Sequence, residues 1–224
     1  MDPTAQLALA SLLFLVTHFV PSTPLRPALV NTIGERAYLG TYTVVAFATI
    51  IWMARSYGAA STEALWSGPR ILPMLVMPIA LILLVCGVAS RNPTAVRQES
   101  LLDTAEPARG MLRVTRHPAM WAFMLWAGAH TIALGTVRAL ILFGSFLLLA
   151  ALGTLLIDAR KATRPGDGWR RFAAATSNVP FVAIAQGRNR FDAAEIGWVK
   201  PLVGLVLFAV LLAVHPWLFG VRPY

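Results

Sequence analysis

The residues from Ala139 to Ile157, ALILFGSFLLLAALGTLLI, contain no charged side chain and decide the fold class. A helix of this length rises about 28 Å, because each residue adds about 1.5 Å, so it nearly crosses the hydrocarbon core of a bilayer, about 30 Å thick. Arg138 and Asp158 bound the stretch and would lie at the two membrane surfaces. The stretch therefore predicts a transmembrane helix.

Five further runs of 18 to 23 uncharged residues lie on either side of this stretch. They cover residues 3–25, 37–54, 71–90, 118–137 and 201–221. We expect helices at these runs over Pro3–Val20, Ala37–Trp52, Ile71–Ser90, from Pro118 onward, and over Val199–Phe219, the last of which begins two residues before its run. Six such runs predict an all-α fold, a polytopic membrane helical bundle of six transmembrane helices that forms one domain over residues 1–224.

The composition agrees with a membrane protein, since 57% of the residues are hydrophobic and only 13% are charged, against about a quarter charged in soluble domains. Alternate segments between the runs hold 4 Lys and Arg on one side and 15 on the other. The positive-inside rule places the richer side, with the basic loops 91–116 and 158–200, in the cytoplasm, so both termini are periplasmic. The net charge of +9 then predicts contact with anionic membrane lipids and not with nucleic acid.

Four histidines lie in or beside the predicted spans: His18, His117, His130 and His215. An ionisable side chain inside a membrane is costly, so each marks a candidate functional site. Neutral imidazole is a common axial ligand of haem iron. The sequence contains no HExxH pair, and its single cysteine, Cys86, offers no cysteine-ligated metal site.

Helical geometry limits which histidines can share an iron. His117 and His130 are 13 residues apart on one helix, which leaves them about 220° apart around it. One ligand must therefore come from another helix, and by depth His18 with His117, or His130 with His215, would pair most easily. Trp126, one turn before His130, would wall a porphyrin or belong to an interfacial aromatic belt.

A second candidate site lies where the fourth helix begins. Pro118 suits the first helical position and His117 the cap. The helix N-terminus together with Arg113 and Arg116 predicts an anion site for haem propionates, a phosphate or a substrate carboxylate. Helix capping and contact with lipid headgroups are the alternative.

Two acidic residues, Glu35 and Asp158, lie closest to the spans. Basic residues stand beside them in the sequence: Arg36 follows Glu35, and Arg160 and Lys161 follow Asp158. We therefore expect both carboxylates to form surface ion pairs.

The stretch GMLRVTRHP at residues 110–118, which continues through Trp121, Trp126 and Ala129-His130, is the most specific of several motifs. The others include Thr17-His18, GERAY at 34–38, Asp158-Ala159-Arg160 and TSNVPF at 176–181. In these residues the chain resembles, over nearly its whole length, the NnrU family of integral membrane proteins, which implies a bacterial inner membrane location.

The resemblance also implies a function. NnrU proteins are associated with nitrite and nitric oxide reduction in denitrifying bacteria. They are similar to 15-cis-ζ-carotene isomerase, in which the redox state of a haem b gates double-bond isomerisation. By this resemblance we expect haem b with His18 and His130 as its axial metal ligands and His117 as a nearby helper. The substrate would be a small hydrophobic molecule or a nitrogen oxide.

Two other readings of the sequence remain open. Arg116-His117-Pro118, followed by a hydrophobic hairpin, also resembles isoprenylcysteine carboxyl methyltransferases. Those enzymes bind S-adenosylmethionine at such a motif and at paired glutamates after the hairpin, whereas Asp158 stands here without a Glu-Glu pair. The third reading is a non-enzymatic accessory subunit with a respiratory reductase as its membrane partner.

Overall fold

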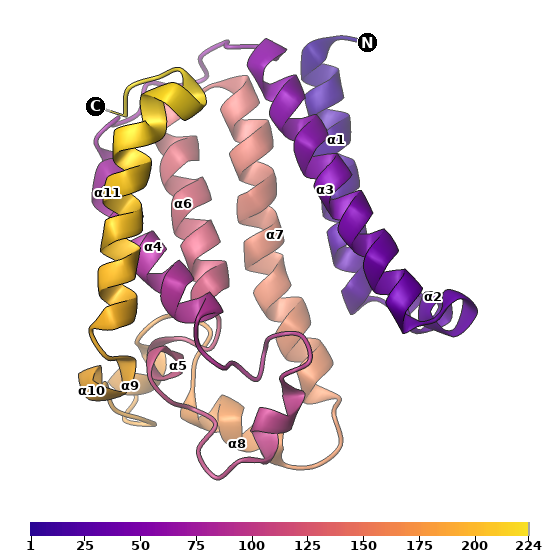
Figure 1. Cartoon of the computed structure of the whole chain (residues 1–224), viewed down its shortest axis with the longest axis vertical. Coiled ribbons are helices and arrows are strands. Elements are labelled where there is room, and N and C mark those ends of the chain that lie inside the picture. The colour runs from indigo at the N-terminus through magenta and orange to yellow at the C-terminus, as the bar shows by residue number, and fades with distance from the viewer. Residues whose placement is uncertain (224) are drawn as a thin grey trace. The chain divides into compact units, whose positions relative to one another are not determined.

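The computed structural model describes residues 1–223, which form helices and turns and no β-strand beyond one isolated bridge between Ala64 and Thr136. The helices are α1 (Pro3–Phe19), α2 (Leu25–Ile33), α3 (Glu35–Ala59), α4 (Leu72–Val88), α5 (Met111–Val114), α6 (Pro118–Leu134), α7 (Val137–Ala162), α8 (Gly168–Ala175), α9 (Val182–Ala185), α10 (Ala193–Ile196) and α11 (Val199–Phe219), with 3-10 turns η1 (Val20–Ser22) and η2 (Glu99–Asp103) (Figure 1). The all-α prediction is confirmed.

Within residues 1–223, four helical segments are long and apolar enough to cross a membrane: Pro3–Ser22, α3, α7 and α11. The apolar helix α4 and the helix α6 are shorter, with 17 residues each. The expected start of α6 at Pro118 and the expected bounds of α11 are confirmed. Helix α3 covers Glu35–Ala59, not the expected Ala37–Trp52, because a helix continues past its apolar run into residues whose charged ends reach water.

The proline-rich segment after α1 contains a helix that the sequence did not predict. The segment contains Pro21, Pro24 and Pro27, and α2 nevertheless covers Leu25–Ile33. Pro24 stands at its N-cap and Pro27 in its first turn, where backbone N–H groups have no partner within the helix. Proline costs little at such positions.

Contacts divide the chain into two compact units, which are described separately. The first unit contains residues 1–69 and 127–149, and the second contains residues 70–126 and the chain from residue 150 on. Helices α6 and α7 each contribute residues to both units.

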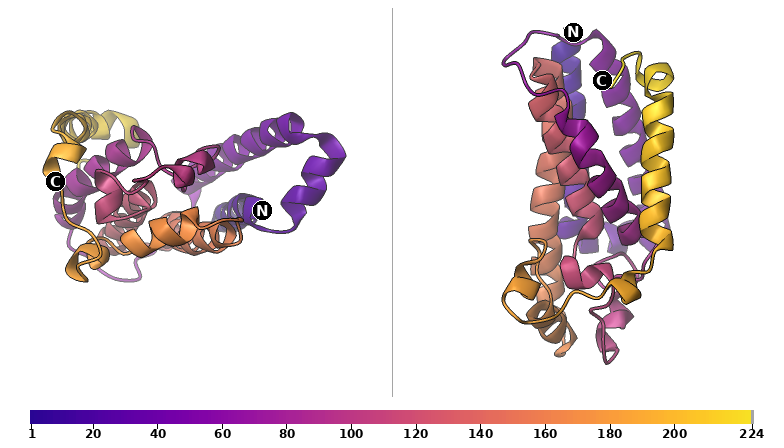
Figure 2. Two further views of the ribbon diagram at one scale, coloured as in Figure 1. Left: turned by 90° about the horizontal axis from the view of Figure 1, so that it is seen from below. Right: turned by 90° about the vertical axis from the view of Figure 1, so that its left-hand side faces the viewer.

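In the first unit α1 and α3 lie side by side, joined through η1 and α2 (Figures 1 and 2). Its core includes Leu7, Ala10, Phe14, Met53 and Ala60, against which residues of α7 such as Phe146 pack. The segment after α3 is fixed to the end of α6 and to the turn that follows, since Trp66 Nε1 donates to the carbonyl of Ile132 at 2.9 Å and the Leu65 N–H donates to that of Gly135 at 2.7 Å. Gly135 in this turn has φ +56°, and a Cβ there would lie 2.1 Å from the Trp66 carbonyl oxygen.

In the second unit α4 and α11 lie side by side (Figure 1). Gly204 of α11 permits this packing, because a Cβ at that position would lie 2.8 Å from Cα of Ile82 on α4. Short helices of the two long loops form a further core, in which Trp169 and Phe172 of α8 are buried against Leu102 and Leu112. These loops position the side chains that are described next.

Candidate functional site

His18 lies near the end of α1 in an aromatic setting within the first unit. Its ring is 4.1 Å from the Phe14 ring and 5.6 Å from the Tyr42 ring, measured between centroids. Its Nδ1 lies 2.7 Å from the Phe14 carbonyl oxygen. Because a carbonyl only accepts, Nδ1 carries the proton, and Nε2 then presents a lone pair. Within residues 1–223, no hydrogen bond uses that Nε2.

His130, the second predicted metal ligand, belongs to the same unit. Its ring stacks on Phe143 of α7 with centroids 5.0 Å apart and planes inclined by 25°. Phe146, one turn further along α7, contacts Phe14 at 5.0 Å. Helix α7 therefore places Phe143 against His130, and Phe146 against the Phe14 ring that packs on His18.

Two buried hydroxyl groups accompany this aromatic cluster. Ser11 Oγ on α1 and Tyr38 Oη on α3 are buried and have no hydrogen-bond partner among the described residues. The Tyr38 ring stacks on Tyr42 at 6.4 Å, and the Arg26 guanidinium lies 5.7 Å from its centroid. A buried hydroxyl group without a hydrogen-bond partner destabilises the fold. The hydroxyl groups of Ser11 and Tyr38 could therefore donate hydrogen bonds to an oxygen atom of a bound ligand.

His117 lies in the second unit and is almost completely buried, with 2% of its surface exposed. Its Nε2 donates to Asp158 Oδ1 at 2.7 Å. Arg116 donates from Nε and Nη2 to Asp158 Oδ2 at 2.9 and 2.5 Å, and its guanidinium lies 5.9 Å from the Trp169 ring. One carboxylate therefore joins both polar residues of the Arg-His-Pro motif.

Arg113 is held in a similar way by Glu195. Its Nε and Nη2 donate to the two Glu195 carboxylate oxygens at 2.7 and 2.9 Å, and the Gly110 N–H donates to one of them at 2.7 Å. The hydrogen bonds from Arg113, with that from Gly110, lower the pKa of Glu195 to about 2. This pair fastens α5 to α10.

The expectation of a surface ion pair is confirmed at Glu35, whose partner is Arg26, and needs correction at Asp158. Asp158 is 17% exposed in its side chain and pairs with Arg116 and His117, not with its sequence neighbours. Glu35 pairs with Arg26 at 3.5 Å and not with Arg36. Sequence proximity was a poor guide because successive helical residues point to different sides.

The predicted cofactor residues fall into two sets. His18 and His130 belong to the first unit, and His117, Arg113, Arg116 and Trp126 belong to the second. Trp126 forms an edge-to-face contact with Phe123, with centroids 6.3 Å apart. An anion at Arg113 or Arg116 would have to compete with the carboxylates that these side chains already bind.

His215 contributes to neither set. It lies near the end of α11, where its Nδ1 donates to the Val221 carbonyl at 2.9 Å. No group of three or more His, Cys, Asp or Glu side chains in the described part of the chain is arranged to hold a metal ion.

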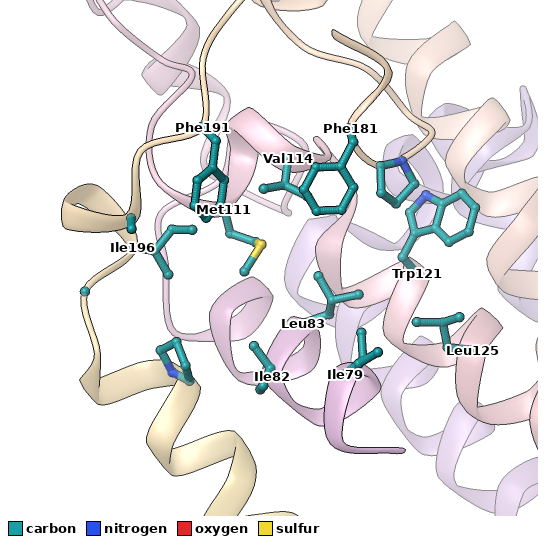
Figure 3. Close-up of a pocket in the computed structure, with 14 residues that line it drawn as sticks. Ile79, Ile82, Leu83, Met111, Val114, Trp121, Leu125, Phe181, Phe191 and Ile196 are labelled. Carbon is teal, nitrogen blue, oxygen red and sulfur yellow. The ribbon is translucent and has the colours of Figure 1, made fainter. Parts of the chain in front are cut away.

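An apolar cavity of about 470 Å³ lies within the second unit (Figure 3). Residues of α4, α5, α6, α10 and α11 and of the loops around α9 and α10 form its walls: Ile79, Ile82, Leu83, Met111, Val114, Trp121, Leu125, Phe181, Phe191 and Ile196, with Pro180, Ala193, Gly197 and Pro201. Nearly all of the lining is apolar, so the cavity suits a hydrophobic ligand.

Two residues fix the shape of this cavity. Trp121, one turn after His117, donates from Nε1 to the Asn178 carbonyl at 2.8 Å. Phe181 has φ +66°, a left-handed conformation that is strained for a residue with a bulky side chain. Its N–H donates to the Val114 carbonyl at 2.8 Å, which holds the strained residue against α5. No sequence pattern predicted this cavity, since its walls come from segments far apart in the chain.

Comparisons with known proteins agree with the resemblance in the motifs. Over 80 residues the chain is 34% identical to "15-cis-zeta-carotene isomerase, chloroplastic" from Arabidopsis thaliana, a match that covers 36% of this chain and 22% of that protein. The protein of the same name from Zea mays is 32% identical over 81 residues, with the same shares covered. The matched part is thus about a fifth of each relative. No solved structure matches the chain at a significant level.

The profile of the family described as "NnrU protein" matches residues 6–223. This match includes the four histidines and both long loops, and it extends through both compact units. The chain therefore belongs to the NnrU protein family.

Proposed function

We propose that the chain is a six-span inner-membrane protein that binds haem b through His18 and His130 and carries out a redox-linked, isomerase-like reaction on an apolar substrate. The observation that carries this proposal is the lone pair on Nε2 of His18, which the hydrogen bond from Nδ1 to the Phe14 carbonyl leaves free for iron. Histidines that bind metals are commonly oriented by such a hydrogen bond from the other ring nitrogen.

The proposed topology adds α4 and α6 to the four helices that are long enough by themselves. A helix of 17 residues rises about 26 Å, which the thinner parts of a bilayer accommodate. The 15 Lys and Arg residues on one side of the six spans, against 4 on the other, support cytoplasmic long loops and periplasmic termini.

Haem b fits the donor groups of the first unit. His18 and His130 would supply the two imidazoles, and Phe14, Phe143 and Tyr42, which contact these rings, would supply apolar walls. The buried hydroxyl of Tyr38, beside Arg26, would donate to a propionate. When bound, haem supplies an iron that changes its oxidation state and its ligand number.

The apolar cavity favours a hydrophobic substrate over nitrite. Nitrite is an anion, and a lining such as Leu83, Trp121 and Leu125 offers it no charged or hydrogen-bonding partner. Binding of a polyene in the same cavity is favourable, because the apolar surface of the polyene is removed from water. By analogy with the isomerases that the chain resembles, these side chains would hold the chain of double bonds and exclude water.

The test is an absorption spectrum of the detergent-solubilised full chain before and after dithionite. We expect a Soret band that shifts on reduction, and its loss or a large decrease in His18→Ala and in His130→Ala. His215→Ala is the matched control and keeps the band, because His215 lies on α11 and bonds only to a nearby carbonyl. A colourless protein that binds S-adenosylmethionine saturably would overturn the proposal in favour of a methyltransferase.

A further inference from the structure

A second pocket, also of about 470 Å³, lies in the second unit and is strongly basic. Four arginines line it: Arg113, Arg171, Arg188 and Arg190. Glu106 is the only acidic side chain among its described lining residues. Because Glu195 neutralises Arg113 from outside the lining, the pocket keeps a net charge of about +2.

Three of these guanidinium groups have no carboxylate partner. No ion pair in the described part of the chain involves Arg171, Arg188 or Arg190. Arg171 and Arg190 also form no side-chain hydrogen bond there, and both are exposed. Like charges that converge on one pocket repel each other, so an anion between them would relieve that repulsion.

The walls of the pocket are held in place by hydrogen bonds to the end of α8. Arg188 donates from Nη1 to the carbonyls of Ala174 and Thr176 at 2.6 and 2.7 Å. The neighbouring Asn189 donates from Nδ2 to the carbonyls of Ala175 and Arg113, at 2.5 and 3.1 Å. These bonds connect the loop after α9 to both α8 and α5, so the pocket is formed before any ligand arrives and binding orders little of the chain.

We propose that this pocket binds a phosphoryl group, carried either by a lipid headgroup or by a free phosphate. Guanidinium groups bind phosphate oxygens through two parallel hydrogen bonds, and several of them can share one doubly charged anion. The volume exceeds that of a phosphate alone, which leaves room for the rest of a headgroup. Its lining shares no residue with the apolar cavity and includes neither His18 nor His130, so the proposal does not depend on the proposed function.

The test compares two probes on the full chain in neutral detergent: sodium pyrophosphate and short-chain phosphatidic acid, with phosphatidylcholine as the lipid reference. We expect at least one of the two to raise Tm by about 2 °C or more at saturation. A rise with pyrophosphate identifies a free phosphate as sufficient. A rise with phosphatidic acid alone identifies a lipid headgroup.

The variant Arg171→Ala/Arg190→Ala removes the two exposed guanidinium groups without removing a hydrogen bond of the fold. We expect it to weaken binding at least about tenfold. Arg91→Ala is the matched control, since Arg91 is exposed and lies outside the pocket lining. The proposal is overturned if neither probe raises Tm, or if the double variant binds as tightly as the Arg91 variant.

Discussion

His117 and Asp158 are 41 residues apart in the chain, yet Nε2 of the histidine lies 2.7 Å from Oδ1 of the aspartate. The contact joins the residue just before α6 to the end of α7, and Arg116 binds the same carboxylate. The Arg-His-Pro motif is therefore part of a buried charged network in this protein. That network closes one end of the α6–α7 hairpin and lies beside Trp121, which forms a wall of the apolar cavity.

Asp158→Asn should destabilise the second unit, because it leaves Arg116 without its carboxylate in a mostly buried site. Breaking such a pair costs roughly 3–5 kcal/mol, which lowers Tm by about 6–20 °C in a chain of this size. Asp167→Asn is the control, since Asp167 pairs with Arg170 where both side chains are more than half exposed. Thermal unfolding of both variants tests this prediction. Equal Tm values for Asp158→Asn and Asp167→Asn would contradict the stabilising role of the buried network.

The pair of Glu195 and Arg113 should make stability depend on acid pH. Arg113 holds the pKa of Glu195 at about 2, below its ordinary value of 4.5. The ionised Glu195 carboxylate, paired with Arg113, contributes its full stabilisation above about pH 4.5. This contribution is lost as the pH falls from there toward 2, where the carboxylate becomes protonated in the folded chain as well. The Tm difference between the natural chain and Glu195→Gln should therefore be large at pH 6 and smaller at pH 3. A difference that does not change with pH would argue against the ion pair.

Gly204→Ala should push α11 away from α4. The added Cβ would lie 2.8 Å from Cα of Ile82 and 3.0 Å from the Leu81 carbonyl oxygen, and neither backbone atom can move alone. Overpacking of this kind costs about 1–3 kcal/mol, which chemical or thermal unfolding in detergent will measure. Gly128→Ala provides the comparison, because a Cβ there meets no atom within 4 Å, and it should leave stability unchanged or raise it.

Leu125→Trp should fill the apolar cavity and exclude its ligand. The fluorescent polyene cis-parinaric acid is a suitable probe, and we expect its affinity to fall at least about tenfold. Leu75→Trp adds the same side chain to α4 at a residue that is 64% exposed and lies outside the cavity lining, so binding should persist. Equal binding to both variants would show that the polyene occupies another place.

The long helices could be predicted from the sequence because a bilayer imposes a simple requirement on length and charge. The bounds of α11 and the start of α6 at Pro118 followed from the charges that flank each run. Helix α2 was missed because its prolines stand where a helix tolerates them. Helices α5, α9 and α10 have four residues each, too few for a periodic pattern to indicate a helix.

The candidate site was only partly predictable. The four histidines stand out in the sequence because ionisable groups are rare within apolar runs, and the bond from His18 to Phe14 links residues only four apart. The partners of His117 and Arg113, in contrast, lie 41 and 82 residues away. No local pattern connects such positions. The network around Asp158, the ion pair of Arg113 with Glu195 and both pockets could therefore be found only from the folded structure.

The central claim is that two imidazoles from separate helices, His18 and His130, hold a haem iron. Electron paramagnetic resonance of the oxidised, purified chain tests this most directly, because an iron(III) haem with two imidazole ligands is low-spin. We predict a low-spin signal that disappears or becomes high-spin in His18→Ala. A low-spin signal that is unchanged in His18→Ala, or no haem signal from protein produced with an ample haem supply, would contradict it.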